Sequence, residues 1–363
     1  MQMKLGVIGL PNVGKSTLFN ALTNANANVA NYPFCTIEPN IGVVPIRDDR
    51  LRGLADIFQS EKTVQATVEF VDIAGLVQGA SHGEGLGNRF LSHIREVDAL
   101  LHVVRCFEDS DIAHVNKKID ALADYRTVET ELILADIEHL ERRHERVVRA
   151  AKSNTPEILD ELAVIERLLD HLNDGRPARD FSFDSSEFEF LRHLSLLTMK
   201  PEMIVANVAE SDNGFSQLCL NELIDAFDSE KAIIPLSLRL ESEIAELPAE
   251  EQVLFLEELG LECGGLTRVI RCAYELLGLI SFFTANKKEA HAWTIRRGSS
   301  AFDAAGIIHT DFQRGFIRAE VIPLEELLDR GSLVAAREKG LVRSEGKSYV
   351  VREDDFILFR FNV

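Results

Sequence analysis

The feature that most constrains this chain is a glycine-rich segment close to its start. Residues 9–17 are GLPNVGKST and match the pattern G-x-x-x-x-G-K-S. The apolar run Leu5 to Ile8 precedes the segment, and residues 18–22 after it can begin a helix. A glycine loop between a strand and a helix is the setting of a P-loop, whose backbone N–H groups surround phosphate oxygens. In such a loop Lys15 would reach the β- and γ-phosphates, and the Ser16 hydroxyl would ligate Mg²⁺.

The composition agrees with a soluble chain of two or three domains. The 363 residues are 46% hydrophobic and 27% charged, and no apolar run approaches the roughly 20 residues that cross a bilayer. The five cysteines are scattered without a C-x-x-C pair, and the chain leads straight into its first strand, so we expect a cytoplasmic protein without a signal peptide. A net charge of -20 opposes non-specific binding to nucleic acid, so an RNA partner would need a local basic patch.

Two later segments extend the predicted nucleotide site. Thr36 lies in a loop marked by Pro33, and it is the candidate threonine that closes on Mg²⁺ and the γ-phosphate. The predicted strand 68–72 ends in Asp72, which begins the pattern D-x-x-G and can hold Mg²⁺ through water. Gly75 can then offer its backbone N–H to the γ-phosphate. The glycine-rich residues 76–87 are typical of a loop that orders and disorders at low cost.

The residue after Gly75 departs from the Ras-like pattern. Ras-like enzymes carry a water-orienting glutamine there, whereas this chain has Leu76, which cannot hydrogen-bond water. Another group must therefore position the nucleophile, or hydrolysis is slow. His114 follows the predicted strand 99–107 and could orient the water, but a solvent-exposed loop histidine explains it equally well.

A strand and a loop near the middle of the chain are the candidates for base recognition. The strand 203–206 is followed by Asn207-Val208-Ala209-Glu210, where GTPases carry N-K-x-D. The aspartate of that motif accepts hydrogen bonds from guanine N1–H and N2–H₂, and adenine offers neither group. Glu210 and Val208 remove this guanine recognition, so the base preference should relax or move to ATP. Ser237, at the end of the predicted strand 231–237, lies where the last base-contacting loop is expected.

Between these motifs the chain contains a predicted helical insertion. Apolar residues alternate at spacings of three and four over 133–151 and again over 158–172, and Thr155-Pro156 is a typical helix start. The pattern predicts an antiparallel helical hairpin. Its basic residues are Arg142, Arg143, Arg146, Arg149 and Lys152. They form either a surface for a phosphate backbone or a solvated face balanced by Glu138, Glu141 and Glu145.

The last part of the chain predicts a small α+β module after helical turns at 254–279. Strands are expected at 281–285, 291–295, 315–321, 348–351 and 356–361, with a helix at 301–308. Basic residues lie near Phe312 and Phe316: Lys287, Lys288, Arg296, Arg297, Arg314 and Arg318. They indicate either an RNA surface or core aromatics with ordinary surface charge.

Taken together, these motifs resemble the YchF/Obg-like ATPase subfamily of Obg-related P-loop NTPases, in the TRAFAC class. The matching stretches are GLPNVGKST, NYPFCTIEPN, DIAGLV, NVAE, GFIRAEV and FRFNV. The resemblance implies an α/β P-loop domain at 1–277, interrupted by a helical insertion at about 126–200. It also implies a TGS domain of ubiquitin-like β-grasp fold at 278–361. Members of the family bind ATP at least as well as GTP, hydrolyse it slowly and associate with ribosomes.

The resemblance also assigns roles to individual residues. Phosphate binding falls on Asn12, Val13, Gly14, Lys15, Ser16 and Thr17, Mg²⁺ binding on Ser16 and Thr36, and base recognition on Asn207 and its neighbours. A water-positioning role for His114 is supported, because the family departs from the glutamine rule in the same way. Ser237 sits in Pro-Leu-Ser-Leu rather than the common S-A-K, and the insertion and residues 211–215 look variable, so partner contacts are not transferred there.

We therefore predict a Mg²⁺-dependent ATPase whose bound nucleotide gates association with the ribosome, expected at the large subunit, with rRNA or tRNA meeting the basic patches and no membrane contact. Lys15 and the loop amides would stabilise charge on the transferring phosphoryl group, with His114 as the second candidate catalytic residue. GTP is a secondary substrate, and Asn12 suggests K⁺ near the phosphates. Two alternatives stay open: a GTPase acting in ribosome assembly or translation, and a nucleotide-gated scaffold with incidental hydrolysis.

Overall fold

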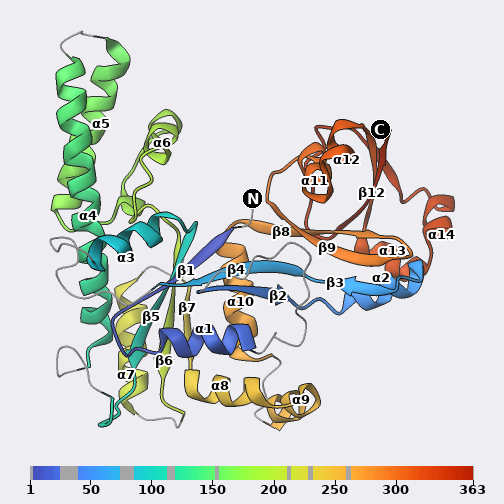
Figure 1. Ribbon diagram of the computed structural model, residues 1–363, viewed down its shortest axis with the longest axis horizontal. Coiled ribbons are helices and arrows are strands. Elements are labelled where there is room, and N and C mark those ends of the chain that lie inside the picture. Colours follow the sequence, from blue (N-terminus) through green and yellow to red (C-terminus); the bar gives the residue numbers. More distant parts are fainter. Residues whose placement is uncertain are drawn as a thin grey trace. The chain divides into compact units, whose positions relative to one another are not determined.

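The computed structural model describes residues 3–24, 40–73, 86–112, 119–151, 155–210, 214–227, 232–258 and 263–362 (Figure 1). The chain divides into two units. The first contains Met1–Gly42 and Glu69–Val269, and the second contains Val43–Val68 and Ile270–Val363. Within the described ranges, no helix combines the length and the apolar character needed to cross a membrane.

One sheet has six strands in the order β2-β4-β1-β5-β6-β7, of which β1, β5, β6 and β7 lie wholly in the first unit. Its strands are β1 (Lys4–Ile8), β2 (Ile41–Ile46), β4 (Ala66–Asp72), β5 (Ala99–Cys106), β6 (Glu202–Val208) and β7 (Ile233–Leu236). The pairs β4–β1, β1–β5, β5–β6 and β6–β7 are all parallel. Every residue of β5 is buried, as expected for a parallel strand covered on both faces. The predicted α/β P-loop architecture is confirmed.

Several helices lie between these strands and after them along the chain. They are α1 (Lys15–Asn24), α3 (Leu86–Arg95), α4 (Ala121–Ala150), α5 (Pro156–Asn173), the 3₁₀ turn η3 (Ala178–Asp180), α6 (Ser185–Arg192), α7 (Gly214–Ala226), α8 (Leu238–Glu246), α9 (Ala249–Glu258) and α10 (Gly265–Leu276). Because all strands in the pairs above are parallel, their carboxyl ends meet at one edge, where ligands of such sheets bind.

The predicted helical hairpin is confirmed as α4 and α5, which lie side by side (Figure 1). The apolar stripes of the two helices meet in one buried cluster, which includes Leu140 of α4 and Leu168 of α5. Pro156 occupies the first turn of α5, where its missing N–H costs nothing. The cluster extends to Leu191 of α6, so the helical insertion has a core of its own.

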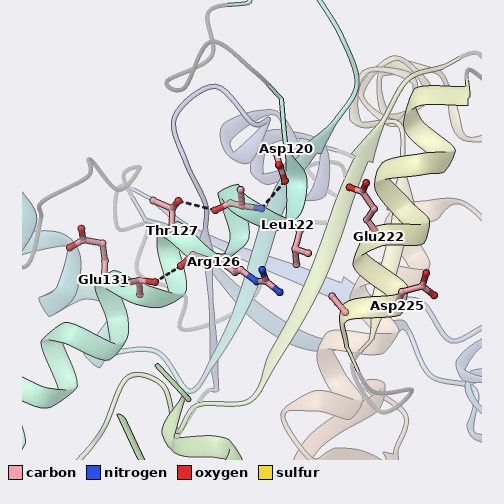
Figure 2. Close-up of a pocket in the computed structure, with 10 residues that line it drawn as sticks. Asp120, Leu122, Arg126, Thr127, Glu131, Glu222 and Asp225 are labelled. Carbon is pink, nitrogen blue, oxygen red and sulfur yellow. Dashed lines mark hydrogen bonds between the residues drawn. The ribbon is translucent and has the colours of Figure 1, made fainter. Parts of the chain in front are cut away.

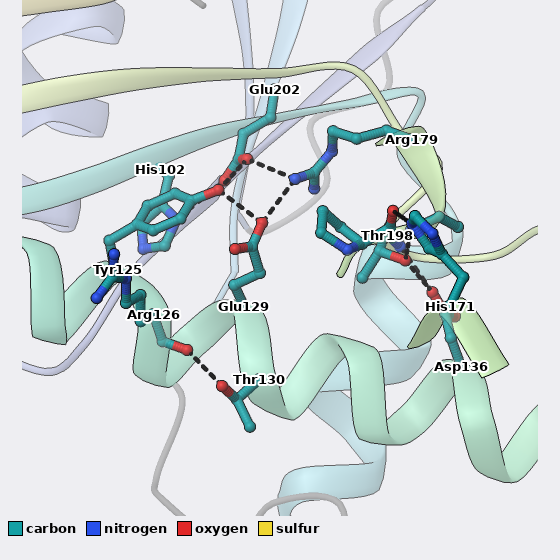
Figure 3. A network of polar contacts seen from close by, with 12 residues as sticks. His102, Tyr125, Arg126, Glu129, Thr130, Asp136, His171, Arg179, Thr198 and Glu202 are labelled. Atoms are coloured by element: carbon teal, nitrogen blue, oxygen red, sulfur yellow. Dashed lines mark hydrogen bonds and ion pairs between the residues drawn. The ribbon is translucent and has the colours of Figure 1, made fainter. Parts of the chain in front are cut away.

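Buried and half-buried polar groups attach the base of this insertion to the sheet (Figure 3). The Tyr125 hydroxyl on α4 lies 2.8 Å from carboxylate oxygens of both Glu129 and Glu202. Arg179 donates to Glu129 at 2.7 Å, and His102 Nδ1 lies 3.0 Å from Glu202. Polar groups that are buried must be paired to offset their desolvation, so this network requires a defined placement of α4 on β5 and β6.

The second unit is built on a six-stranded mixed sheet in the order β11-β10-β12-β8-β9-β3. Its elements are α2 (Arg50–Phe58), β3 (Lys62–Val64), β8 (Leu279–Ala285), β9 (Glu289–Arg296), α11 (Ala301–Ile308), α12 (Thr310–Arg314), β10 (Phe316–Pro323), α13 (Leu324–Arg330), α14 (Leu333–Glu338), β11 (Arg343–Glu345) and β12 (Asp355–Phe361). Because strand residues alternate between faces, Phe282 packs with α11 on one face and Phe283 packs with α2 and α13 on the other. This α+β unit confirms the predicted fold class of the last part of the chain.

The described elements differ from the sequence predictions mainly in the last part of the chain, where α12, α13, α14 and β11 add to the one helix and the strands expected there. Residues 348–351 were expected to form a strand, but Val350 makes only an isolated bridge to Ser300. Tyr349 N–H closes a turn onto the Gly346 carbonyl, so the strand propensity of Tyr-Val-Val is overridden locally. Residues 43–68 group with the second unit, where β3 pairs with β9, and nothing in the sequence predicted this pairing. The domain boundaries 1–277 and 278–361 stay predictions.

Candidate nucleotide site

The glycine loop connects β1 to α1 with a backbone that requires glycine. Gly9 and Gly14 have φ values of 145° and 108°, which L side chains rarely adopt. A Cβ on Gly9 would lie 2.4 Å from the Val103 carbonyl oxygen, and one on Gly14 would lie 2.7 Å from Asn207 Nδ2. The loop therefore fits closely against β5 and β6, and its N–H groups lie at the start of α1, where anions bind.

Lys15 is the first residue of α1, and its side chain is buried. Its Nζ donates to the Leu10 carbonyl at 2.7 Å, so the ammonium folds back across the loop. Burial lowers the pKa of Lys15 to about 8, and the nearby Asp72 carboxylate opposes this shift. A phosphate group at the loop would offset the desolvation in the same way that Asp72 does.

Ser16 and Asp72 place two oxygen atoms that can ligate a metal ion side by side. The Ser16 hydroxyl donates to Asp72 Oδ2 at 3.1 Å, and Asp72 lies at the end of β4, opposite Val7 of β1. Mg²⁺ takes oxygen ligands, keeps several waters and needs only one or two groups from the protein. The two side chains therefore fit this ion, although the described residues include no cluster of three or more metal-binding side chains.

Asn207 joins the loop to the base-recognition segments. Its side chain is buried, its Nδ2 donates to the Val13 carbonyl at 2.9 Å, and its Oδ1 accepts from Leu238 N–H at 3.2 Å. We expected this amide at the edge of the base, but both of its polar atoms hold backbone groups of the loop and of α8. Sequence reasoning missed this bridge because residues 13, 207 and 238 are distant along the chain.

The other candidate base residues leave the sheet beside Asn207. Val208 ends β6, and the register pairs Asn207 with Leu236 of β7. Ser237 caps α8 by accepting from Leu240 N–H at 3.4 Å. Glu210 Oε1 lies 3.0 Å from Nε of Arg239, a residue that the sequence analysis did not single out. These residues thus meet at the carboxyl ends of β6 and β7.

Arg105, also missed from the sequence, organises the loop after β5. Its buried guanidinium donates to the carbonyls of Phe107, Asp109 and Ile112 at 3.0, 3.0 and 3.1 Å, and it lies 4.6 Å from the Phe107 ring centroid. Burial lowers its pKa, and Asp109 opposes the shift. The sequence offered one signal for this role, an arginine near the end of a buried strand, because the partners of Arg105 are backbone carbonyls.

Thr36, Gly75, Leu76 and His114 lie outside the described residues, so their predicted roles stay predictions.

A separate groove of about 850 Å³ lies between α4 and α7 (Figure 2). Its charged lining consists of Asp120, Glu131, Glu222 and Asp225 with one guanidinium, Arg126. Four carboxylates repel phosphate groups, so this groove does not compete with the glycine loop as the nucleotide site.

A glycine loop whose lysine and serine meet an aspartate at the end of a neighbouring parallel strand defines a P-loop nucleoside triphosphatase. Two family models match the chain: MMR_HSR1, described as "50S ribosome-binding GTPase", over residues 4–136, and YchF-GTPase_C, described as "Protein of unknown function (DUF933)", over residues 279–362. The chain belongs to the YchF family, as relatives 48% and 50% identical to it over their full length show.

Individual relatives resemble the chain over its whole length. It is 48% identical to the "Ribosome-binding ATPase YchF" of Bacillus subtilis (strain 168) and 50% identical to that of Haemophilus influenzae, with 100% of both chains covered in each comparison. The structure of the Schizosaccharomyces pombe YchF GTPase matches with a TM-score of 0.89 and 35% identity. That match covers 99% of this chain and 98% of the other, so the fold is shared throughout.

Proposed function

We propose that this protein is a cytoplasmic, Mg²⁺-dependent ATPase that associates with ribosomes and whose bound nucleotide gates that association. The observation that carries the ATPase proposal is the cluster of Lys15, Ser16 and Asp72 beside the glycine loop. The names of the relatives supply ATP and the ribosome as the first candidates for substrate and partner.

In this proposal the residues around the loop have distinct roles in binding the phosphates, Mg²⁺ and the base. The phosphates contact Asn12, Val13, Gly14, Lys15, Ser16, Thr17 and Gly75. Ser16, Thr36 and Asp72 hold Mg²⁺, which when bound neutralises charge on the phosphates. The base lies against Asn207, Val208, Glu210 and Ser237. Lys15 stabilises charge on the transferring phosphoryl group, and His114 orients water. Asn12 contributes to a K⁺ site, and equal ATPase rates in Na⁺ and K⁺ would remove that part.

We further propose that the second unit, as a TGS domain, contacts RNA of the large ribosomal subunit. Three half-exposed arginines, Arg318, Arg337 and Arg360, surround the single carboxylate of Glu320 at 2.6–3.3 Å. Arg318 and Arg360 lie directly opposite each other on β10 and β12, an arrangement of like charges that is unfavourable without an anion. One carboxylate leaves a net charge of about +2 here, in a chain of net charge -20.

The helical hairpin is a weaker candidate for this contact. Arg142 and Arg149 each pair with a glutamate one turn earlier on α4, Glu138 and Glu145. Such pairs are typical of a solvated helix face, which favours the second of the two interpretations left open by the sequence.

The first test is titration of the nucleotide-free protein with ATP and GTP in the presence of Mg²⁺, beside the variant Ser16→Ala. We expect ATP to bind at least as tightly as GTP and the variant to lose the Mg²⁺-dependent part of the affinity. A clear preference for GTP would instead favour the GTPase alternative.

The second test is co-sedimentation with ribosomal large subunits over a range of salt concentrations. The variant Arg337→Gln/Arg360→Gln should bind more weakly, with a log–log salt slope about 2 smaller, because two phosphate contacts are lost. The matched control is Arg142→Gln/Arg149→Gln. A larger effect in the control than in the test variant would move the RNA contact to the hairpin.

ATP turnover that stays negligible even with ribosomes would favour the scaffold alternative.

A further inference from the structure

An arginine stands beside the acidic residue of the base-recognition segment. Arg239 Nε lies 3.0 Å from Glu210 Oε1 and donates to Glu243 Oε1 at 3.4 Å. The Arg239 side chain is 78% exposed and that of Glu210 is 44% exposed, so both can meet a ligand. The contacts given for both glutamates are made by Nε of Arg239, and the guanidinium carries five N–H donors in all.

The position of this pair follows from the contacts of Asn207. That side chain ties the glycine loop, through Val13, to the first residue of α8, Leu238. Glu210 lies three residues beyond Asn207, and Arg239 follows Leu238 directly. Both therefore emerge at the carboxyl ends of β6 and β7, next to the loop that receives the phosphates, where the base of a nucleotide would reach them.

The pair differs chemically from a lone carboxylate. A lone carboxylate only accepts, so it favours guanine, which donates from both N1–H and N2–H₂. A carboxylate beside a guanidinium presents one acceptor and one donor. Adenine matches that combination with its N6–H₂ donor and N1 acceptor, and guanine matches it with N1–H and O6. The 2-amino group of guanine then adds nothing to the binding affinity.

We propose that Arg239 is a specificity-determining residue, which with Glu210 forms a donor–acceptor pair that accepts either purine. This inference rests on the base site placed at residues 207–210 and 237 in the proposed function. Arg239 lowers the preference for guanine by occupying part of the Glu210 carboxylate, and it supplies the donor that adenine N1 requires.

A purely structural role for Arg239 predicts a different result. Exposed ion pairs, including the one with Glu243 a turn later on α8, contribute little to stability. If Arg239 only forms ion pairs on the helix surface, its removal leaves the relative affinities of all purine nucleotides unchanged.

The experiment compares Mg²⁺-dependent binding of ATP, GTP and ITP, which is GTP without the 2-amino group. Wild type should bind GTP and ITP within about twofold of each other. In Arg239→Ala, ATP should weaken by about 3- to 10-fold, the change expected for one lost hydrogen bond, and GTP should bind more tightly than ITP by a similar factor. Arg239→Lys keeps a donor and should retain most of the wild-type ratio.

The matched control is Arg176→Ala, which removes another exposed, ion-paired arginine, bonded to Asp174 at 2.9 Å in the helical insertion. Its ATP, GTP and ITP affinities should equal those of wild type. Unchanged ratios in Arg239→Ala would overturn the proposal. Failure of wild type to bind any of the three nucleotides would instead overturn the proposed function, so the two failures are distinguishable.

Discussion

Replacing Asn207 by alanine tests whether this residue bridges the site or recognises the base. The substitution removes the bonds to the Val13 carbonyl, at 2.9 Å, and to Leu238 N–H, at 3.2 Å. Both backbone groups then stay buried without that partner. Each such group costs about 1–3 kcal/mol, and the second bond is long, so we expect a loss of about 2–4 kcal/mol in the free energy of unfolding.

The same bridge predicts how nucleotide binding changes. Asn207 holds the loop and α8 rather than one particular base, so ATP and GTP should lose affinity by the same factor in Asn207→Ala. The assays are urea unfolding of the nucleotide-free protein followed by circular dichroism, and titration with both nucleotides. The fluorescence of Trp293, the only tryptophan, follows the second unit separately.

The matched control is Asn221→Ala on α7, which loses an exposed bond from Gln217 at 2.9 Å. We expect the control to change the unfolding free energy by less than about 0.5 kcal/mol. The reasoning is refuted if Asn207→Ala changes the ATP/GTP ratio several-fold while the unfolding free energy of the nucleotide-free protein stays that of wild type. Such a result would return Asn207 to the base edge.

Three further perturbations follow from the described contacts. The pKa of Lys15 is about 8 without nucleotide, and bound phosphates would raise it. ATP binding at pH 9 should therefore take up a proton, and the affinity for ATP should fall as the pH rises further. Calorimetry in buffers of different ionisation enthalpy measures the proton uptake, and zero uptake would contradict this prediction. Hydrogen bonds from arginines, chiefly Arg360, lower the pKa of Glu320 to about 2. The stability that the Glu320 carboxylate contributes is therefore present above about pH 4.5 and lost as the pH falls towards 2. Acid unfolding should need a lower pH in wild type than in Glu320→Gln. Asp136 accepts from Leu197 N–H, Thr198 N–H and the Thr198 hydroxyl at 2.7–2.8 Å, so Asp136→Ala should lose about 3–5 kcal/mol in urea unfolding, and a loss below about 1 kcal/mol would show that water replaces the carboxylate.

The order of the motifs along the chain was enough to predict the nucleotide site in outline. The loop at 9–17, Asp72 after an apolar strand and Asn207 after another are local patterns, and parallel strands bring their carboxyl ends to one edge whatever the loops between them do. The helical hairpin was equally accessible, because the spacing of apolar residues over 133–151 and 158–172 reports which face each helix buries.

Electrostatic pairing was not accessible in the same way. The clamp of Arg105 on three backbone carbonyls and the pair of Glu210 with Arg239 depend on side chains meeting groups that no sequence pattern identifies. Arg318, Arg337 and Arg360 are spread over 43 positions. The register of β10 with β12 places Arg318 opposite Arg360, and α14 brings Arg337 to the same carboxylate of Glu320.

Residues 41–72 show both what the sequence determines and what only the tertiary structure decides. The propensity of their last residues to form a strand is a local property, and the sequence predicted the strand that ends at Asp72. That β3 joins β9, more than 200 residues later, to complete the sheet of the second unit is a long-range choice. Burial of α2 against β8, β9 and α13 makes that choice favourable, and such burial exists only once distant segments have come together.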